Sequence, residues 1–253
     1  MKRNLLVASA ALAGALGLTA CSYNPELGRN QLLLVNDSSL VSAAQEAWQQ
    51  SLSTQKLSRD PALNERVRHV GQRIVQAAGM GDRQWQYAVF DDPSANAFAL
   101  PGAEIGVNTG LLKIATTDDQ LAAVIGHEVG HVVAHHAAER MSQETAAQIG
   151  LGVAQSALGG AAGSRSQALA SLGSAGAQLG FLLPYSRKHE LEADRLGVDF
   201  MHAAGYDPRQ AVTLWEKMQA QGASAPPVFL STHPSDASRI EALRQYIASR
   251  GWG

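Results

Sequence analysis

The chain has 253 residues, of which 45% are hydrophobic, enough apolar side chain to bury the core of one or two domains. The 20 basic and 22 acidic residues give a net charge of -2, which argues against binding to nucleic acid or to an anionic membrane through bulk charge. Cys21 is the only cysteine, which excludes an intramolecular disulfide and a cysteine metal cage.

The first twenty residues have the features of a secretory leader. Lys2 and Arg3 precede an apolar stretch, Leu5–Ala20, that is too short and too rich in small residues for a membrane span. Without this leader, 20 basic and 22 acidic residues become 18 and 22, so the net charge becomes -4. Leu18-Thr19-Ala20 before Cys21 resembles the lipobox of bacterial lipoproteins, which implies acylation of Cys21.

Ser22 after the cysteine implies sorting to the cell outer membrane, with the lipid anchor facing the periplasm. The alternative is an ordinary leader that is cleaved near Ala20 and leaves a free thiol at Cys21. The expected organisation is a lipoprotein signal peptide at 1–20, a lipid-anchored tether with an N-terminal helix at 21–59, and a main domain at 60–249.

Two helices are predicted in and just after the tether. Residues 23–37 show no clear period and suit a connecting segment. Ser38 or Ser39 can cap a helix that runs through about residue 55. Asp60, followed by Pro61 at the first helical position, opens a second helix to about residue 78. Its apolar face consists of Val67, Val70, Ile74 and Val75.

A small antiparallel sheet is predicted next. Residues 84–90 alternate large apolar residues with polar or small ones, as a half-buried strand does. Residues 96–107 contain Pro101-Gly102 in the middle and are typical of a hairpin whose second arm is Ala103–Val107.

The remainder is predicted to be mostly helical, so the expected fold class is α+β, mainly α-helical. A helix begins near Thr117, which can cap it, and continues towards Met141. Between Gly150 and Gly180 the composition favours two short helices; a disordered linker and a membrane-dipping hairpin are the alternatives. Further helices are predicted at 187–204, 208–220 and 235–249.

The helix after Thr117 contains an HExxH motif, His127-Glu128-Val129-Gly130-His131. Four residues span about one helical turn, so both imidazoles lie on one face and can reach one zinc ion. Glu128 is then placed to take a proton from water at the metal and to pass it to a leaving amine. The alternative is a solvated helix face with two incidental histidines.

The neighbouring histidines are not expected to share this ion. His135 lies about 12 Å along the helix from His127, at about 1.5 Å per residue. His136 points elsewhere on the helix, and Ala137 stands where a metzincin has its third histidine.

The third ligand is expected on a later helix, in His189-Glu190-Leu191-Glu192-Ala193-Asp194. Glu190 and Asp194 share one face there. Glu190 completes a two-histidine, one-glutamate zinc site with an open fourth position. Asp194 is expected to accept an N–H bond from a ligand histidine. An acidic run on a helix is also typical of a solvated face.

These motifs together resemble the HtpX/BepA/LoiP-type family of gluzincin zinc metalloendopeptidases, as a periplasmic lipoprotein member. The resemblance covers about 61–247 and rests on HEVGH, on SRKHELEADRLG, on NAFALPG with GVNTGLL, and on Thr232-His233-Pro234 with Arg239. It implies one zinc ion bound by His127, His131 and Glu190, with Glu128 as the general base.

The resemblance also implies roles for two residues of the C-terminal block and for one strand. His233 is either a gate that occupies the open zinc position or a group near the transition-state oxyanion; a plain loop histidine is the alternative. Arg239 orients this loop or binds substrate, or forms a surface salt bridge. Ala103–Val107 is expected to be an edge strand that pairs with an extended peptide.

The expected function is hydrolysis of peptide bonds in misfolded or stalled envelope proteins. The expected partners are those polypeptides, the membrane through the N-terminal lipid, and outer-membrane assembly machinery. One alternative is a zinc-containing chaperone or assembly factor that cuts little; a metal-storage or sensing lipoprotein is another. Residues 150–180 are expected to form a plug over the cleft.

Overall fold

The computed structural model describes residues 21–35, 37–157, 184–221, 228–234 and 237–252. Most of the segment that was expected to form a plug, from residue 158 to residue 180, lies outside these residues. The leader at 1–20 lies outside them as well.

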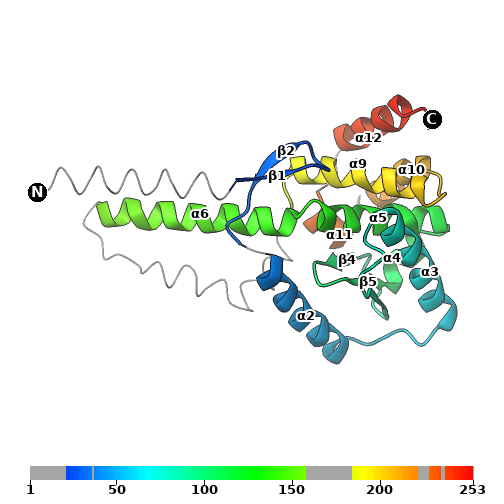
Figure 1. Ribbon diagram of the computed structural model, residues 1–253. Coiled ribbons are helices and arrows are strands. Elements are labelled where there is room, and N and C mark those ends of the chain that lie inside the picture. The colour runs from blue at the N-terminus through cyan, green and yellow to red at the C-terminus, as the bar shows by residue number, and fades with distance from the viewer. Residues whose placement is uncertain (1–20, 36, 158–183, 222–227, 235–236, 253) are drawn as a thin grey trace, which may run out of the picture.

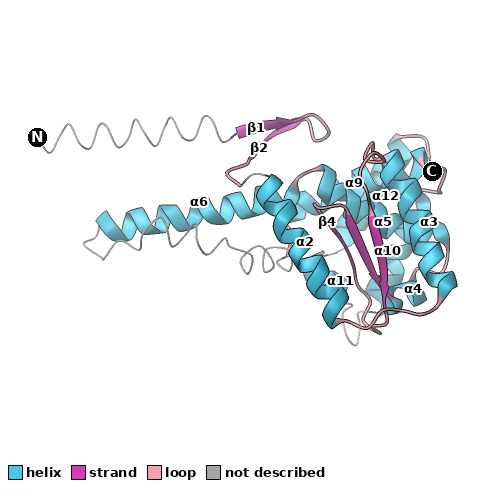
Figure 2. Cartoon of the chain, turned by 60° about the horizontal axis from the view of Figure 1, so that its bottom comes forward, coloured by secondary structure: helices cyan, strands magenta, loops and turns pink. Residues whose placement is uncertain are grey.

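A three-stranded sheet separates two layers of helices (Figure 2). Its strand order is β3 (Gln86–Phe90), β5 (Glu104–Asn108), β4 (Ala97–Leu100), with β3 parallel and β4 antiparallel to β5. Helix α2 (Asp37–Thr54) covers one face through the buried Trp48, and α3 (Pro61–Ala77) covers the other.

The β4–β5 hairpin is antiparallel as predicted, and the α+β, mainly helical class is confirmed. The prediction that Ala103–Val107 forms an edge strand was wrong. Strand β5 is central and buried along its whole length, because β3 pairs with its other side. The edge strands are β3 and β4, and β4 is half-buried at Phe98 and Ala99.

Helix α5 (Asp118–Val133) carries the HExxH motif through the centre of the molecule (Figure 1). Thr117 caps it as predicted, since its side chain accepts from the Gln120 N–H. Helix α5 packs closely on α9 (Arg187–Ala203). A methyl group added at Gly197 would lie 2.9 Å from the His127 backbone nitrogen. Because glycines line this contact, the two ligand-bearing backbones can approach each other.

The predicted continuation of this helix to Met141 was wrong. Helix α5 ends at Val133, His135 has φ 53°, and α6 (His136–Ala157) starts as a new helix. The side-chain amide of Gln31 donates to the Ala134 carbonyl at 2.7 Å. This carbonyl at the helix end therefore finds a partner on a segment about a hundred residues earlier.

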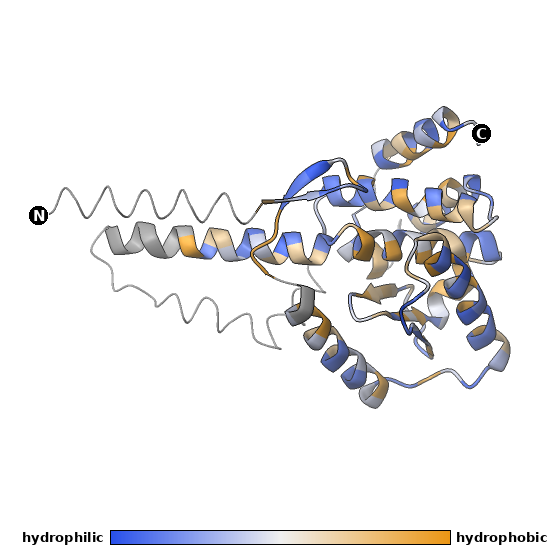
Figure 3. Ribbon diagram, viewed as in Figure 1, coloured by the Kyte–Doolittle hydropathy of each residue, from blue (hydrophilic) through white to orange (hydrophobic). Residues whose placement is uncertain are grey.

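That segment is a hairpin of β1 (Cys21–Asn24) and β2 (Arg29–Leu32), where the sequence predicted a tether without regular structure. The sequence shows no apolar period for this hairpin, because its buried side chains are the polar Asn24 and Gln31. Figure 3 shows the hairpin as mostly hydrophilic. Cys21, its first residue, is an exposed free cysteine, and acylation there stays a prediction.

Further helices complete the described fold: α4 (Thr109–Ile114), α10 (Arg209–Gln221), α11 (Val228–Thr232) and α12 (Ala237–Ser249). Helices α10 and α12 agree with the predicted ranges, whereas α4 and α11 were not predicted because each is only five or six residues long. None of the described helices combines the length and the hydropathy that a membrane crossing requires.

Candidate metal centre

Four buried side chains converge on one point between α5 and α9. His127, His131, Glu190 and His233 each offer a ligand atom, and these atoms lie within 4.8 Å of one another. The Nε2 atoms of His127 and His131 are 3.1 Å apart, and each lies 3.4 Å from a carboxylate oxygen of Glu190. Ligand atoms about 2.1 Å from one tetrahedral zinc ion are separated by roughly 3.4 Å. The three predicted ligands therefore have the spacing of one zinc site.

The charge of the surrounding groups also fits a dication. The site contains three buried carboxylates and one buried guanidinium. The carboxylates are those of Glu128, Glu190 and Asp194, and the guanidinium is that of Arg239. When all of them are ionised, negative charges exceed positive charges by two. Burial lowers the pKa of His127, but the Glu190 carboxylate and the hydrogen bond to Asp194 outweigh this and raise the pKa to about 9. The same field favours a cation at the centre.

Asp194 and Arg239 hold His127 on the side of its ring that faces away from the other ligands. Asp194 Oδ1 lies 2.9 Å from His127 Nδ1, which leaves Nε2 directed to the other ligands. Arg239 holds Asp194 through two hydrogen bonds of 2.6 and 2.8 Å and lies 2.6 Å from Glu190 Oε2. Its side chain is only 1% exposed, so a surface salt bridge is excluded. Asp194 thus takes the position predicted for it.

His131 has a support that the sequence interpretation missed. Its Nδ1 lies 2.9 Å from Nδ1 of His136, although His136 was predicted to point elsewhere on the helix. On a continuous helix, five residues would turn the two side chains about 140° apart. The break at His135 removes that constraint and turns His136 back towards His131. Tyr185 stacks on a face of the His131 ring, with centroids 3.9 Å apart.

Glu128 lies beside the ligand group and is buried. Burial raises the pKa of Glu128, and the nearby His233, His127 and the Ala99 backbone N–H offset part of this rise. Its Oε1 atom lies 3.4 Å from His233 Nε2. The carboxylate is therefore within reach of a water molecule at the centre, as a general base must be.

His233 offers the fourth ligand atom, beside those of His127, His131 and Glu190. Its Nδ1 lies 3.2 Å from His127 Nε2 and 3.1 Å from Glu190 Oε1. Helix α11 positions it, and Arg239 donates to the carbonyl of Pro234 at 3.1 Å, which fixes the loop. Of the predicted alternatives, a plain loop histidine does not agree with this burial and these contacts.

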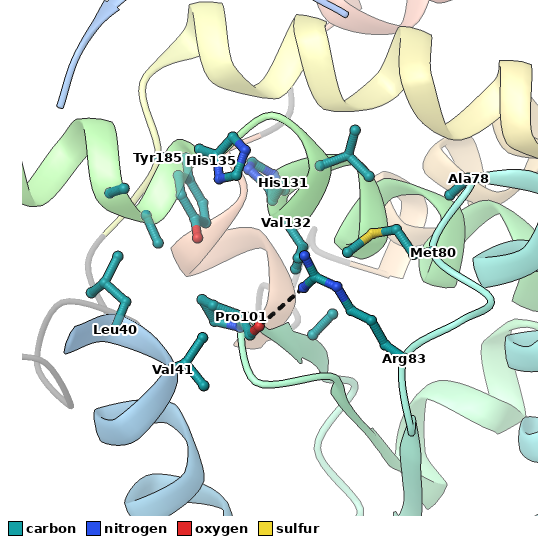
Figure 4. Close-up of a pocket in the computed structure, with 14 residues that line it drawn as sticks. Leu40, Val41, Ala78, Met80, Arg83, Pro101, His131, Val132, His135 and Tyr185 are labelled. Carbon is teal, nitrogen blue, oxygen red and sulfur yellow. Dashed lines mark hydrogen bonds between the residues drawn. The ribbon is translucent and has the colours of Figure 1, made fainter. Parts of the chain in front are cut away.

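A mainly apolar cleft opens beside His131 and Tyr185 (Figure 4). Helix α2 contributes Leu40 and Val41 to one side, and Val132 lies on the opposite side. The edge strand and the turn after it contribute Ala99 and Pro101, and Arg83 lies at the far end.

Comparison with known proteins places this site in a family. Residues 61–247 match the model of Peptidase family M48. The chain belongs to this family. The chain is 36% identical to the mitochondrial metalloendopeptidase OMA1 of Schizosaccharomyces pombe, over 81% of the chain and 60% of that protein. It is 33% identical to the mitochondrial metalloendopeptidase OMA1 of Bos taurus, over 90% of the chain and 46% of that protein.

A bacterial M48 relative is also similar. The beta-barrel assembly-enhancing protease of Escherichia coli is 31% identical over 74% of the chain and 39% of that protein. The chain thus spans 60% or less of the length of these three relatives.

The location predicted from the leader is contradicted by these relatives. Relatives with 36% and 33% identity are mitochondrial, whereas the prediction was a lipid-anchored protein of a bacterial outer membrane. The prediction rested on four small or apolar residues before Ser22, a pattern that an apolar leader readily contains. An M48 domain does not by itself specify a compartment.

Proposed function

We propose that this M48 chain is a zinc-dependent endopeptidase that cleaves unfolded or misfolded polypeptides. His127, His131 and Glu190 hold the zinc ion, and Glu128 is the general base. The observation that carries the proposal is the buried carboxylate of Glu128 beside a ligand group of zinc-site spacing. When bound, zinc supplies a Lewis acid that polarises a carbonyl group and makes water more acidic.

Glu128 moves the proton in this proposal. Its carboxylate accepts a proton from the attacking water and donates it to the leaving amine. Burial raises the pKa of Glu128 above its ordinary value of 4.5, which makes the carboxylate a stronger base. Tyr185 and His136 keep the His131 ring in a single orientation while this happens.

The edge strand β4 supports binding of an extended peptide. The Asn108 N–H donates to the Asn96 carbonyl at 2.9 Å, so residues 96, 98 and 100 direct their backbone groups towards β5. Ala97 and Ala99 then direct theirs away from β5; the Ala99 N–H meets the Glu128 carboxylate, and Ala99 lines the cleft. Backbone pairing makes little demand on sequence but requires an extended chain, which favours unfolded substrates. The apolar cleft wall favours substrates with apolar side chains.

His233 supports a latent state of the same enzyme. It offers a fourth ligand atom to the group, at the position where substrate and water must enter. Movement of α11 and its loop would open that position. This favours the gate among the roles predicted for His233.

The test is cleavage of unfolded casein by the zinc-loaded protein, in the native background and in a His233→Ala background. Glu128→Gln preserves shape and is expected to lower the rate by about 100-fold or more, because general base catalysis is lost. Glu46→Gln, an exposed change on α2, is the matched control and should cleave normally.

Retained cleavage by Glu128→Gln would refute the assignment of the base. A latent enzyme is expected to cleave faster with His233→Ala. If folded, zinc-bound protein cleaves in neither background, the peptidase proposal fails and the chaperone alternative takes its place.

A further inference from the structure

The two histidine ligands on α5 have different hydrogen-bond partners at Nδ1, the ring nitrogen that faces away from the other ligands. His127 meets the carboxylate of Asp194 directly, at 2.9 Å. His131 meets the imidazole of His136 instead, and His136 Nε2 lies 3.1 Å from Glu192 Oε2. His136 is 0% exposed, so water does not replace either contact. A second line of contacts therefore runs from His131 away from the centre.

The proton positions along this line follow from the geometry. His131 directs Nε2 to the other ligands, so as a neutral ligand it carries its proton on Nδ1. Nδ1 of His136 must accept that proton in a hydrogen bond, which places the proton of neutral His136 on Nε2. Nε2 then donates to Glu192. A carboxylate thus orients His131 as Asp194 orients His127, with one imidazole inserted between them.

Arg29 of the β1–β2 hairpin anchors this carboxylate. Its guanidinium donates to Glu192 at 2.6 and 2.7 Å and to Glu139 at 2.7 and 2.7 Å. The Arg29 side chain is 15% exposed, and those of Glu139 and Glu192 are 7% and 11% exposed. Bidentate arginine–carboxylate pairs fix the orientation of the carboxylate as well as its distance, and they are strong where water is largely excluded.

The hairpin also holds the helix break that brings His136 into place. Gln31 Nε2 lies 2.7 Å from the Ala134 carbonyl and 2.7 Å from Glu139 Oε2. Asn24 donates to Gln31 Oε1 at 3.0 Å. The hairpin therefore contacts the chain between His131 and His136 as well as the carboxylate beyond them.

We propose that the β1–β2 hairpin is a positioning element of the metal centre, and that Arg29 acts on His131 through Glu192 and His136. The hairpin precedes residues 61–247, which match the M48 family model, so the peptidase region is completed by a segment outside it. The inference rests on the proposed zinc site but not on peptidase activity, because its test measures metal binding.

The test compares zinc affinity of the full chain, by competition with a chelator, and the visible absorption spectrum of the Co2+ form. Arg29→Met removes the charge at similar size and is expected to weaken zinc binding by about 10- to 100-fold and to change the Co2+ spectrum. Arg68→Met is the matched control, because Arg68 pairs with Glu65 on the exposed face of α3. A folded Arg29→Met protein with the zinc affinity and spectrum of Arg68→Met would overturn the proposal.

Two further variants separate positioning from a merely structural role. If Arg29 acts through His136, the double variant with Arg29→Met and His136→Leu binds zinc as weakly as His136→Leu alone. Additive losses would overturn the proposed route. If Arg29→Met does not fold, Glu192→Met removes the acceptor for His136 at similar size and leaves Arg29 paired with Glu139. A native Co2+ spectrum for folded Glu192→Met would then refute the inference.

Discussion

Glu104 is a buried carboxylate whose removal should stabilise the protein in a pH-dependent way. It lies in the central strand β5, is 0% exposed, and finds no hydrogen-bond partner on any other of the described residues. Burial raises the pKa of Glu104 from 4.5 to about 7. We expect Glu104→Gln, which cannot ionise, to remove the dependence of stability on this group.

The sign and size follow from the two pKa values. Below pH 4.5 the carboxyl is protonated in both the folded and the unfolded protein, so it adds no penalty. Between pH 4.5 and 7 only the unfolded chain loses its proton, and the native protein loses stability as the pH rises. The full difference of about 2.5 units corresponds to about 3 kcal/mol at pH 8.

The assay is urea unfolding of native protein and Glu104→Gln at pH 4.5 and pH 8. Because both proteins have the same metal site, its own pH dependence cancels in the comparison. The difference in the free energy of unfolding is expected to grow by up to about 3 kcal/mol in favour of Glu104→Gln between the two pH values. A difference that stays constant, or that grows in favour of the native protein, would refute the reasoning.

Two further variants test how α3 and α9 are built. Gly197→Ala places a methyl group 2.9 Å from the His127 nitrogen, so we expect a loss of about 1–3 kcal/mol in urea and weaker zinc binding. Gly81→Ala is its control, because its methyl group would meet the flexible Gln76 side chain at 3.1 Å and the Gln76 backbone only at an ordinary contact distance of 3.5 Å. Equal effects of the two variants would contradict the close-packing argument. Asp60→Ala removes the cap that accepts from the Ala62 N–H at 2.8 Å, and it should cost about 1 kcal/mol of stability while zinc affinity stays unchanged.

Local patterns in the sequence were sufficient to predict much of the site. The HExxH spacing alone places His127 and His131 on one face of a helix, and the caps at Asp60 and Thr117 are formed as expected. Each of these features depends on residues within one or two helical turns. Glu190 needed the HExxH motif as context, because an acidic run on a helix has no distinctive local pattern of its own.

The features that the sequence did not predict depend on distant contacts. Strand β5 looked like an edge because its parallel neighbour β3 is separated from it by β4 in the sequence. His136 was assigned to the wrong direction because the break after α5 depends on Gln31, which lies about a hundred residues earlier. Arg29 stands in a polar segment without a period, so no pattern could relate it to Glu139 and Glu192.

The supports of the two histidine ligands show why a catalytic motif is not sufficient to define its site. In each support, an arginine fixes a carboxylate and the carboxylate fixes an imidazole, so the unligated nitrogen has one direction available. The Arg239 support lies wholly within the M48 match, whereas the Arg29 support begins in the hairpin before it. An isolated ion pair near the surface contributes little, but here the Arg239 pair restricts the His127 ring directly, and the Arg29 pair restricts the His131 ring through His136. The residues that orient the ligands therefore extend beyond the segment that contains them.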